Sequence, residues 1–255
     1  MIYISHLLSD MEMKEVIEQT GAGLESIEFS IAENLDSLSE KLRAYKIRLD
    51  NMGKPELTMH GPFLDINPVA YDREIRKVTM LRYSQSYEAA RELGAKKIVY
   101  HTCLNPDVYL LTGWADRMVD FMQEFLSDRQ DMEVVMENVY DLEWNPILET
   151  AKKLPYDNFK LCLDIGHAHR FSPIPVSEWA KNLEKYLSHI HVHDNLKDWD
   201  NHLALGNGSI PLEEVLACLR KRENITYTIE CNTKEDVLLS YQRLQKLLSG
   251  EGMHV

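Results

Sequence analysis

Short apolar runs alternate with longer amphipathic segments along the whole chain of 255 residues, and this alternation constrains the fold more than any other feature. Runs such as Ile98-Val99-Tyr100 are apolar at consecutive positions, which is typical of strands that are covered on both faces. The pattern predicts eight strands, at residues 2–5, 26–30, 56–60, 97–101, 133–137, 160–164, 189–193 and 227–230.

The segments between these strands show helical spacing and helix-end signals. Residues 70–94 are predicted as a helix that ends at Gly94, and Pro211 precedes apolar residues at helical spacing. Ser37 and Thr233 each begin a capping-box pattern, the second one with Asp in place of Glu. Repeated strand–helix units imply parallel strands joined by right-handed crossovers.

Eight such units in 255 residues predict an α/β protein with one domain over residues 1–255, a single (β/α)8 TIM barrel with its active site at the C-terminal mouth of the strands. An open doubly wound sheet is the competing fold. Its nucleotide-binding form would show GxGxxG, or GxxxxGK followed by Ser or Thr, after the first strand, and neither motif occurs there.

The composition limits the partners of the chain. Lys and Arg number 28 against 41 Asp and Glu, so the formal net charge is −13, which argues against a nucleic-acid partner. No apolar run approaches the roughly 18–20 residues of a membrane span, and no leader peptide is recognisable, so we expect no membrane partner. Cys103, Cys162, Cys218 and Cys231 form no CxxC pair and are expected to be reduced thiols in a cytoplasmic protein. The sequence does not indicate an oligomeric state.

Histidines and carboxylates gather where the predicted strands end. Eight of the ten histidines lie at or just beyond these ends: His6, His60, His101, His167, His169, His191, His193 and His202. Glu137, Asp164 and Glu230 close the fifth, sixth and eighth strands. One such residue alone is most often a packing or capping residue. Together at the mouth of a barrel they are typical of a divalent metal site, with zinc, manganese, iron, cobalt and magnesium all open.

Several short motifs follow one another along the chain. They are His60-Gly61-Pro62, His101, Glu137-Asn138, LDIGHAH at 163–169, HVHD at 191–194, Asp200-Asn201-His202, LGNGSI at 205–210 and Thr228-Ile229-Glu230. In this order the chain resembles, over nearly its whole length, the xylose-isomerase-like TIM-barrel superfamily. That superfamily holds sugar isomerases and epimerases together with the class II apurinic/apyrimidinic (AP) endonucleases of AP endonuclease family 2.

The resemblance implies a metal site. Its core ligands would be Glu137, Asp164, His191 and Glu230. The endonuclease branch uses five further ligands to complete a cluster of three zinc ions, and the matching positions hold His60, His101, His167, Asp200 and His202. We therefore expect a divalent cofactor, Zn²⁺ or Mn²⁺, at one to three ions per chain.

The first functional hypothesis is a metal-dependent isomerase or epimerase of a sugar, sugar phosphate or sugar-derived polyol. The ion would stabilise the enediolate that forms when a proton leaves the carbon beside the substrate carbonyl. By resemblance, Glu137 and Glu230 are the proton donor and acceptor, and His167 and His193 hold substrate hydroxyls. A small-molecule carbohydrate is the expected partner.

The alternative is a phosphodiesterase like the class II AP endonucleases, with a trinuclear zinc site. The nine matching ligand positions favour it, whereas the net charge of −13 and the lack of long basic and aromatic loops oppose it. His193 also stands where those endonucleases usually have Asn. A catalytically idle barrel is the third hypothesis, which the complete ligand set disfavours.

Overall fold

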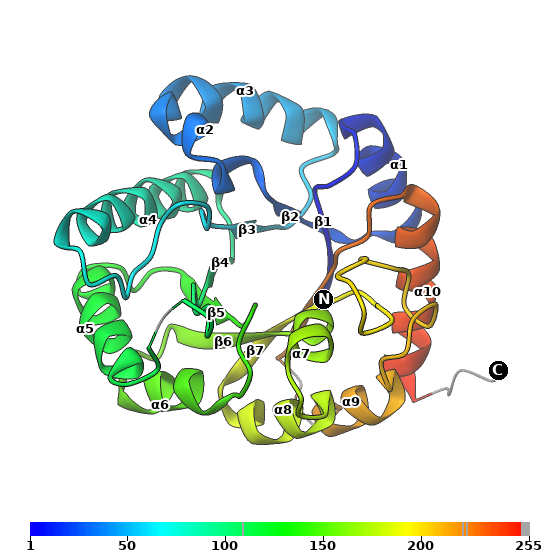
Figure 1. Ribbon diagram of the computed structural model, residues 1–255. Coiled ribbons are helices and arrows are strands. Elements are labelled where there is room, and N and C mark those ends of the chain that lie inside the picture. Colours follow the sequence, from blue (N-terminus) through cyan, green and yellow to red (C-terminus); the bar gives the residue numbers. More distant parts are fainter. Residues whose placement is uncertain (109, 221, 223, 251–255) are drawn as a thin grey trace.

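A computed structural model of the protein shows eight parallel strands in a closed barrel (Figure 1). The structure describes residues 1–108, 110–220, 222 and 224–250. Residues 251–255, the end of the predicted domain, and residues 109, 221 and 223 lie outside this described part. The prediction of a (β/α)8 TIM barrel is confirmed.

Each strand pairs in parallel with its neighbours in sequence, and the last strand pairs with the first. The strands are β1 (Ile2–Ser5), β2 (Gly23–Ser26), β3 (Leu57–His60), β4 (Lys97–His101), β5 (Glu133–Glu137), β6 (Phe159–Asp164), β7 (Leu187–Val192) and β8 (Thr226–Ile229). Most strand residues are buried, because side chains fill the barrel interior and helices cover the outside. This two-sided burial explains the apolar residues at consecutive positions.

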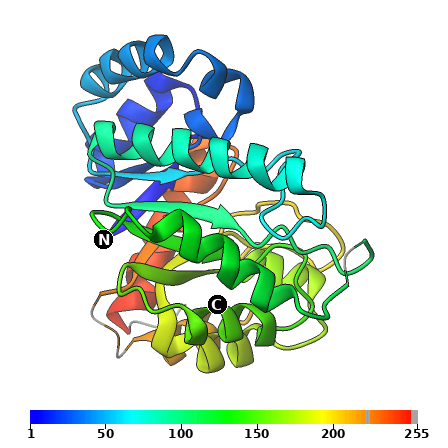
Figure 2. The ribbon, with the colours of Figure 1, turned by 90° about the vertical axis from the view of Figure 1, so that its left-hand side faces the viewer.

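The helices form a ring around the barrel, seen end-on in Figure 1 and from the side in Figure 2. They are α1 (Asp10–Thr20), α2 (Ala32–Asp36), α3 (Leu38–Asn51), α4 (Arg73–Leu93), α5 (Trp114–Leu126), α6 (Asn145–Lys153), α7 (Ile165–Phe171), α8 (Val176–Leu183), α9 (Leu212–Leu219) and α10 (Lys234–Ser249), with 3₁₀ turns η1 (Glu28–Ser30) and η2 (Glu184–Tyr186). In α5, Met118, Phe121 and Phe125 recur at helical spacing and are buried. Among the described residues, no helix is long and apolar enough to cross a membrane.

Three of the four helix-end predictions are confirmed. The Thr233 side chain accepts a hydrogen bond from the Asp236 amide at 3.2 Å, Gly94 ends α4 with a φ of +75°, and α9 begins directly after Pro211. The capping box predicted at Ser37 is wrong. Ser37 is also the C-cap of α2, so its backbone (φ −114°, ψ 37°) lacks the extended conformation of an N-cap, and its side chain makes no capping bond.

The second strand begins three residues earlier than predicted. β2 covers residues 23–26, and most of the predicted strand 26–30 is the turn η1. Local side-chain bonds explain the difference. Ser26 Oγ accepts a hydrogen bond from the Glu28 amide (3.2 Å), and Ser30 Oγ donates one to the Ile27 carbonyl (2.7 Å). The prediction for residues 26–30 is therefore wrong, whereas the other strands agree within two residues at each end.

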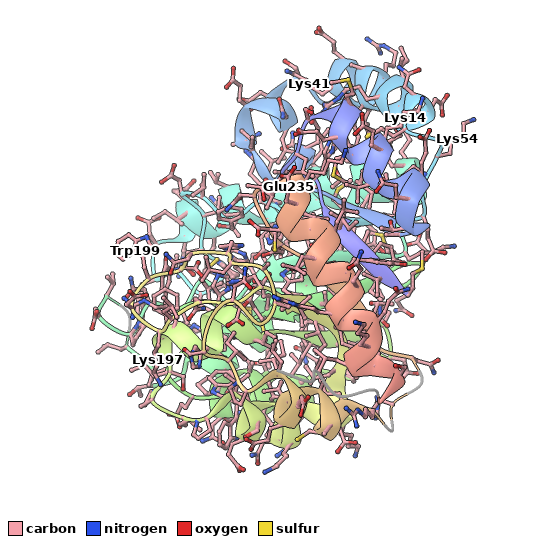
Figure 3. The ribbon with its side chains drawn as sticks, turned by 90° about the vertical axis from the view of Figure 1, so that its right-hand side faces the viewer. Lys14, Lys41, Lys54, Lys197, Trp199 and Glu235 are labelled. Carbon is pink, nitrogen blue, oxygen red and sulfur yellow. The ribbon has the colours of Figure 1, made fainter. Side chains whose placement is uncertain are left out.

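The strand register decides which candidate residues are neighbours at the mouth. His101 on β4 pairs with Glu137 on β5, and Asp164 on β6 pairs with His191 on β7. Figure 3 shows the loop between β7 and α9, which carries the labelled Trp199, projecting at the same end of the barrel. Groups from distant parts of the sequence thus meet at one place.

Candidate metal centre

Three carboxylates meet around one imidazole nitrogen, Nδ1 of His191 on β7. Glu137 Oε2 lies 3.3 Å from this nitrogen, Glu230 Oε1 lies 3.5 Å away and Asp164 Oδ2 lies 3.9 Å away. Glu137 ends β5, Asp164 ends β6 and Glu230 directly follows β8. The structure thus brings together the four residues predicted as core ligands.

Three atoms that face one another in this group, each able to bind a metal ion, are buried and have no hydrogen-bond partner among the described residues. They are Glu137 Oε2, Asp164 Oδ2 and His191 Nδ1. A buried polar atom without a partner costs about 1–3 kcal/mol, and more when it is charged. Carboxylate and imidazole donors that converge in this way can be satisfied together by one divalent cation. The residues therefore fit the ion that the sequence predicts, without selecting one metal.

Asp164 has two separate tasks, one for each carboxylate oxygen. Its Oδ1 accepts a hydrogen bond from the His167 amide at 2.7 Å and so caps the N-terminus of α7, which leaves Oδ2 turned toward the centre. Asn138 fixes the backbone of Asp164 by donating to its carbonyl and accepting from its amide, both at 3.0 Å. This pair of hydrogen bonds between β5 and β6 sets the spacing of Glu137 and Asp164.

A second group joins the ends of β3 and β4 to Glu137. Glu137 Oε2 lies 3.4 Å from His60 Nε2 and 3.6 Å from His101 Nε2, and the two imidazole nitrogens are 3.0 Å apart. His60 Nδ1 lies 2.8 Å from the Gly61 carbonyl, which can only accept, so Nδ1 carries the proton. His60 Nε2 then faces Glu137 and can bind an ion once this nitrogen is deprotonated.

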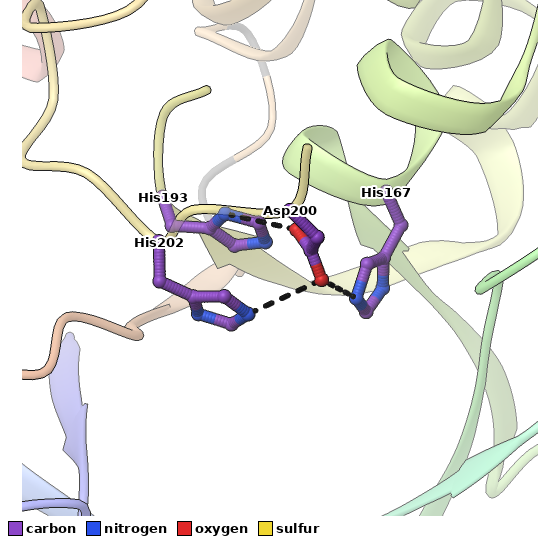
Figure 4. A group of neighbouring side chains, drawn as sticks. All are labelled: His167, His193, Asp200 and His202. Atoms are coloured by element: carbon purple, nitrogen blue, oxygen red, sulfur yellow. Dashed lines mark ion pairs between the residues drawn. The ribbon is translucent and has the colours of Figure 1, made fainter. Parts of the chain in front are cut away.

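A third group surrounds Asp200 in the loop between β7 and α9 (Figure 4). Asp200 Oδ2 lies 3.3 Å from His167 Nε2 and 3.5 Å from His202 Nε2, and Oδ1 lies 3.8 Å from His193 Nδ1. The His193 and His202 rings are stacked, with centroids 3.9 Å apart. His202 Nδ1 also lies 2.8 Å from the Glu230 carbonyl, which leaves His202 Nε2 for Asp200 or an ion.

Backbone bonds hold the loop that carries Asp200 and His202 over the barrel. Asp194 and Leu203 form an antiparallel bridge with two bonds, at 2.9 and 2.8 Å. The Asp194 carboxylate accepts from the amides of Gly206 (2.8 Å) and Ile210 (3.1 Å). None of these bonds involves the candidate ligands Asp200 and His202.

Gly166 in the motif after β6 leaves room for His193. A Cβ atom at position 166 would lie 2.0 Å from Cε1 of the His193 ring. The absence of a side chain thus lets this ring reach Asp164, whose Oδ1 lies 3.2 Å from His193 Nε2. His193 is fully buried in this place.

Glu25 on β2 is a buried group that the sequence pattern did not indicate. Its Oε1 lies 2.9 Å from His191 Nε2, on the side of the ring opposite Nδ1, and its Oε2 lies 3.0 Å from His189 Nε2. The hydroxyls of Thr58 and Thr228 donate to Oε2 at 2.9 and 3.0 Å. A carboxylate behind an imidazole orients it and increases its basicity, so Glu25 prepares His191 Nδ1 to bind a cation.

The charges of the centre influence one another strongly. Burial alone would raise the pKa of Glu137, but the imidazoles of His191 and His101 hold it well below its usual range. Burial alone would lower the pKa of His202, yet Asp200 raises it to about 9. The pKa of His101 falls to about 3, mainly because of burial. Glu137 is thus ionised at neutral pH, as cation binding requires.

A cavity of about 650 Å³ opens onto the centre at the mouth. Six of the nine candidate ligands line it, namely His60, His101, Glu137, His167, His202 and Glu230. Asp164 and His191 are fully buried, and neither they nor His193 line the cavity. A molecule in the cavity would therefore meet Glu137 and Glu230 directly.

Two other residues near strand ends take no part in the centre. His6 contacts the Tyr45 hydroxyl (2.9 Å) and Asp10 (3.1 Å), which gives it a packing role. Cys103 lines the cavity, but burial raises its pKa to about 12, so its thiol stays protonated. All four cysteines are free, as predicted.

The chain shares its sequence pattern with a known family of barrels. Residues 20–248 match the model of the xylose isomerase-like TIM barrel family. The chain belongs to this family. One family relative, an uncharacterised protein of Methanocaldococcus jannaschii, is 27% identical over 258 residues, covering 94% of this chain and 95% of its own. A second uncharacterised protein of that organism is 28% identical over 202 residues, covering 75% and 69%.

Solved structures resemble this xylose isomerase-like barrel over almost its whole length. A D-tagatose 3-epimerase-like protein has a TM-score of 0.79 at 23% identity, covering 98% of this chain and 97% of its own. A protein from Thermus thermophilus, soaked with ZnCl₂, has a TM-score of 0.75 at 22% identity, covering 99% of both chains. D-psicose 3-epimerase from Clostridium cellulolyticum with D-tagatose has a TM-score of 0.71 at 18% identity, covering 98% and 94%. At these identities the likeness establishes the fold.

Proposed function

We propose that this xylose isomerase-like barrel is a metal-dependent isomerase or epimerase of a sugar or sugar derivative. One observation carries the proposal. The carboxylates of Glu137 and Glu230, from two different strands, both approach His191 Nδ1 within 3.5 Å and both line the same cavity. Two carboxylates that reach the cation site and the substrate space together suit proton transfer at a carbon beside a carbonyl.

Glu137, Asp164, His191 and Glu230 would hold the ion, with Glu25 behind His191. A bound divalent ion would polarise the substrate carbonyl and stabilise the enediolate. His60, His101, His167, Asp200 and His202 are the candidates for additional ions. Asp164 and His191 are covered by protein, so their part is to fix the site, whereas Glu137 and Glu230 remain accessible from the cavity.

The chain's own acid–base groups would then move the proton. One of Glu137 and Glu230 removes the proton from the substrate carbon, and the other returns a proton from its own side of the site. General acid–base assistance of this kind contributes about 10²–10⁴-fold in rate. His167 lines the cavity and can donate to a substrate hydroxyl, whereas the buried His193 would support the site from below rather than touch a substrate.

The structural relatives support this choice among possible reactions. The D-psicose 3-epimerase structure contains D-tagatose, so a barrel of this fold accepts a ketohexose. The zinc-soaked relative shows that such a barrel has been studied with a divalent cation. Neither relative identifies the substrate or the metal of this chain.

Solvent hydrogen exchange tests the proposal. The protein loaded with Mn²⁺ or Zn²⁺ is incubated in D₂O with a panel of ketoses and aldoses, and deuterium in the sugar is measured by NMR. We expect exchange beside the carbonyl of at least one sugar, and a decrease of at least about 100-fold in Glu230→Gln. Glu133→Gln is the matched control, because Glu133 lies at the other end of β5 and contacts Lys97. Absence of exchange with every sugar would refute the proposal.

Phosphodiester hydrolysis at abasic sites of DNA is the second candidate. The observation that favours it is the presence of two further ligand groups, His60–His101–Glu137 and His167–His193–Asp200–His202, beside the core group. A cluster of ions is typical of phosphodiesterases. Cleavage of an oligonucleotide with one abasic site, lost in Glu137→Ala and accompanied by about three zinc ions per chain, would replace the first proposal.

A further inference from the structure

The cavity at the mouth has two chemically different halves. The candidate ligands form one half, and they lie at the ends of β3, β4 and β5, directly after β8, in α7 and in the loop between β7 and α9. The other half is mainly aliphatic and aromatic, with side chains from the loops after β1, β2 and β3 and from the start of α4: Leu7, Ile27, Phe63, Leu64, Ile66 and Ile75. Ser5, Ser30, Asp65 and Asn67 also line it. A free hexose has hydroxyl groups around its whole ring and would leave these six apolar side chains without an apolar partner.

Phe63 connects the two halves. Its ring stacks on His101 with centroids 4.6 Å apart and meets His60 edge-on at 5.3 Å. The apolar half therefore begins directly beside the candidate ligands. A molecule whose reacting carbon lies near Glu137 extends onto Phe63 if it has a substituent.

Part of the apolar half is exposed to water. Leu64 is 61% exposed, Ile75 is 44% exposed and Leu7 is 39% exposed. Exposed apolar surface that is continuous with a cavity marks a binding site. The cavity volume of about 650 Å³ lies within the range of about 300–1,000 Å³ that suits drug-sized ligands, which are larger than a monosaccharide.

Lysine and arginine are missing from the described part of the cavity wall. Among the described residues that line it, none is Lys or Arg. Lys14, Lys41 and Lys54 lie on the outer helices or just after them, and Lys197 lies on the loop outside the cavity (Figure 3). A phosphorylated sugar would therefore find only imidazoles, such as that of His202, and no lysine or arginine to pair with its phosphate.

We propose that the natural substrate is a neutral carbohydrate that keeps a free carbonyl group and carries an apolar substituent, such as a ketose with an aryl or alkyl ether on a carbon away from the carbonyl; simple glycosides are non-reacting probes of the same preference. The sugar lies against Glu137 and Glu230, and the substituent lies on Phe63, Leu64 and Ile75. The position of the sugar rests on the proposed function, whereas the preference for an apolar substituent rests only on the cavity wall.

Binding of two matched glycosides tests this inference. Isothermal titration calorimetry of the purified protein with added MnCl₂ compares phenyl β-D-glucopyranoside with methyl β-D-glucopyranoside, and glucose 6-phosphate serves as the anionic probe. One methylene in an apolar pocket changes affinity by about 10–200-fold. We therefore expect the phenyl glycoside to bind at least about tenfold more tightly than the methyl glycoside, and glucose 6-phosphate to bind more weakly than either.

Two variants test which residues cause the preference for the phenyl glycoside over the methyl glycoside. Leu64→Asn and Ile75→Asn each reduce the phenyl-to-methyl ratio by several fold, and both side chains are exposed enough for the fold to tolerate the change. Leu81→Asn is the matched control, since Leu81 is 54% exposed on the same helix as Ile75 but does not line the cavity. Light scattering on the same samples shows whether a second copy of the chain covers the patch.

The outcomes separate this inference from the proposed function. Equal affinities, no binding of either glycoside, tighter binding of glucose 6-phosphate, or a dimer that Leu64→Asn dissociates would each overturn the inference. Binding of these glycosides needs no proton transfer. Failure of the deuterium-exchange experiment would therefore refute the epimerase proposal and leave the measured glycoside preference standing.

Discussion

Glu25→Gln is the perturbation that most sharply tests how the barrel prepares its centre. The Glu25 carboxylate contacts His191 Nε2 through Oε1, and His189, Thr58 and Thr228 through Oε2. Burial alone would raise the pKa of Glu25, but His191 and His189 hold it well below its usual range, so the side chain is an anion. Gln keeps the shape and one acceptor oxygen and removes the negative charge.

The expected effect is on metal affinity. Outer partners of metal-bound imidazoles typically contribute 10–100-fold, which corresponds to about 1.4–2.7 kcal/mol. The amide oxygen of Glu25→Gln can still face His191, and the threonine hydroxyls can rotate to accept from the amide nitrogen, so the loss comes mainly from the missing charge. Competition with a chelating dye gives the dissociation constants for Zn²⁺ and Mn²⁺, and calorimetry of the chelator-treated protein monitors stability.

Glu133→Gln is the control for this experiment. Its carboxylate accepts from Ser188 Oγ at 2.6 Å near the opposite end of the barrel, so the variant is expected to keep the metal affinity of the original protein. If Glu25→Gln binds both metals as tightly as Glu133→Gln does, Glu25 does not support a metal-bound His191 and the reasoning fails.

Three further predictions concern the ion itself. Asp164→Asn keeps the helix cap at the His167 amide but replaces the oxygen that faces His191. We therefore expect its metal affinity to fall more than that of Glu25→Gln, while the chelator-treated variant melts at nearly the same temperature as the chelator-treated original protein. A normal metal content in the variant would contradict this. Chelation of the loaded protein lowers the melting temperature by about 5–10 °C at 100-fold excess of free metal over the dissociation constant, as differential scanning calorimetry can show. The pKa of His202 is raised to about 9, so its imidazole carries a proton at pH 7 before an ion binds at that position. Calorimetry of metal binding in buffers of different ionisation enthalpy should then detect proton release at pH 7 that declines as the pH rises through 9. A number of released protons that does not change with pH would exclude His202 as a ligand.

The fold follows from the sequence because strand and helix signals repeat eight times. Strands that are covered on both faces leave consecutive apolar residues, and Gly94, Pro211 and Thr233 mark helix ends through local backbone chemistry. Parallel pairing then places every strand end at one mouth. This is why the sequence alone assigns residues as distant as 60 and 230 to one site.

Glu25 was not predicted as a site residue, and the reason is physical. Residues 26–30 alternate polar and apolar side chains and therefore look like a strand, but hydrogen bonds of Ser26 and Ser30 with the nearby backbone turn this segment into η1. The strand that exists begins at Gly23, where a Cβ atom would lie 2.4 Å from the Tyr3 ring. A glycine forced by close packing gives no periodicity signal, so the placement of Glu25 inside the barrel required the three-dimensional structure.

The division of the cavity into two halves also could not be predicted from the sequence. Phe63, Leu64 and Ile66 lie in the loop after β3, where apolar residues have no regular spacing. Their common orientation toward the cavity depends on the backbone of that loop, in which Asp65 has a φ of +59°. Loop conformation is set by contacts that a strand–helix pattern does not encode.

Anomalous diffraction from crystals grown with Zn²⁺ or Mn²⁺, measured at the absorption edge of the added metal, tests the central claim most directly. A peak about 2.0–2.2 Å from Glu137, Asp164 and His191 Nδ1 is the predicted result for zinc. Peaks confined to the outer surface, with these three side chains bonded only to one another, would contradict the account.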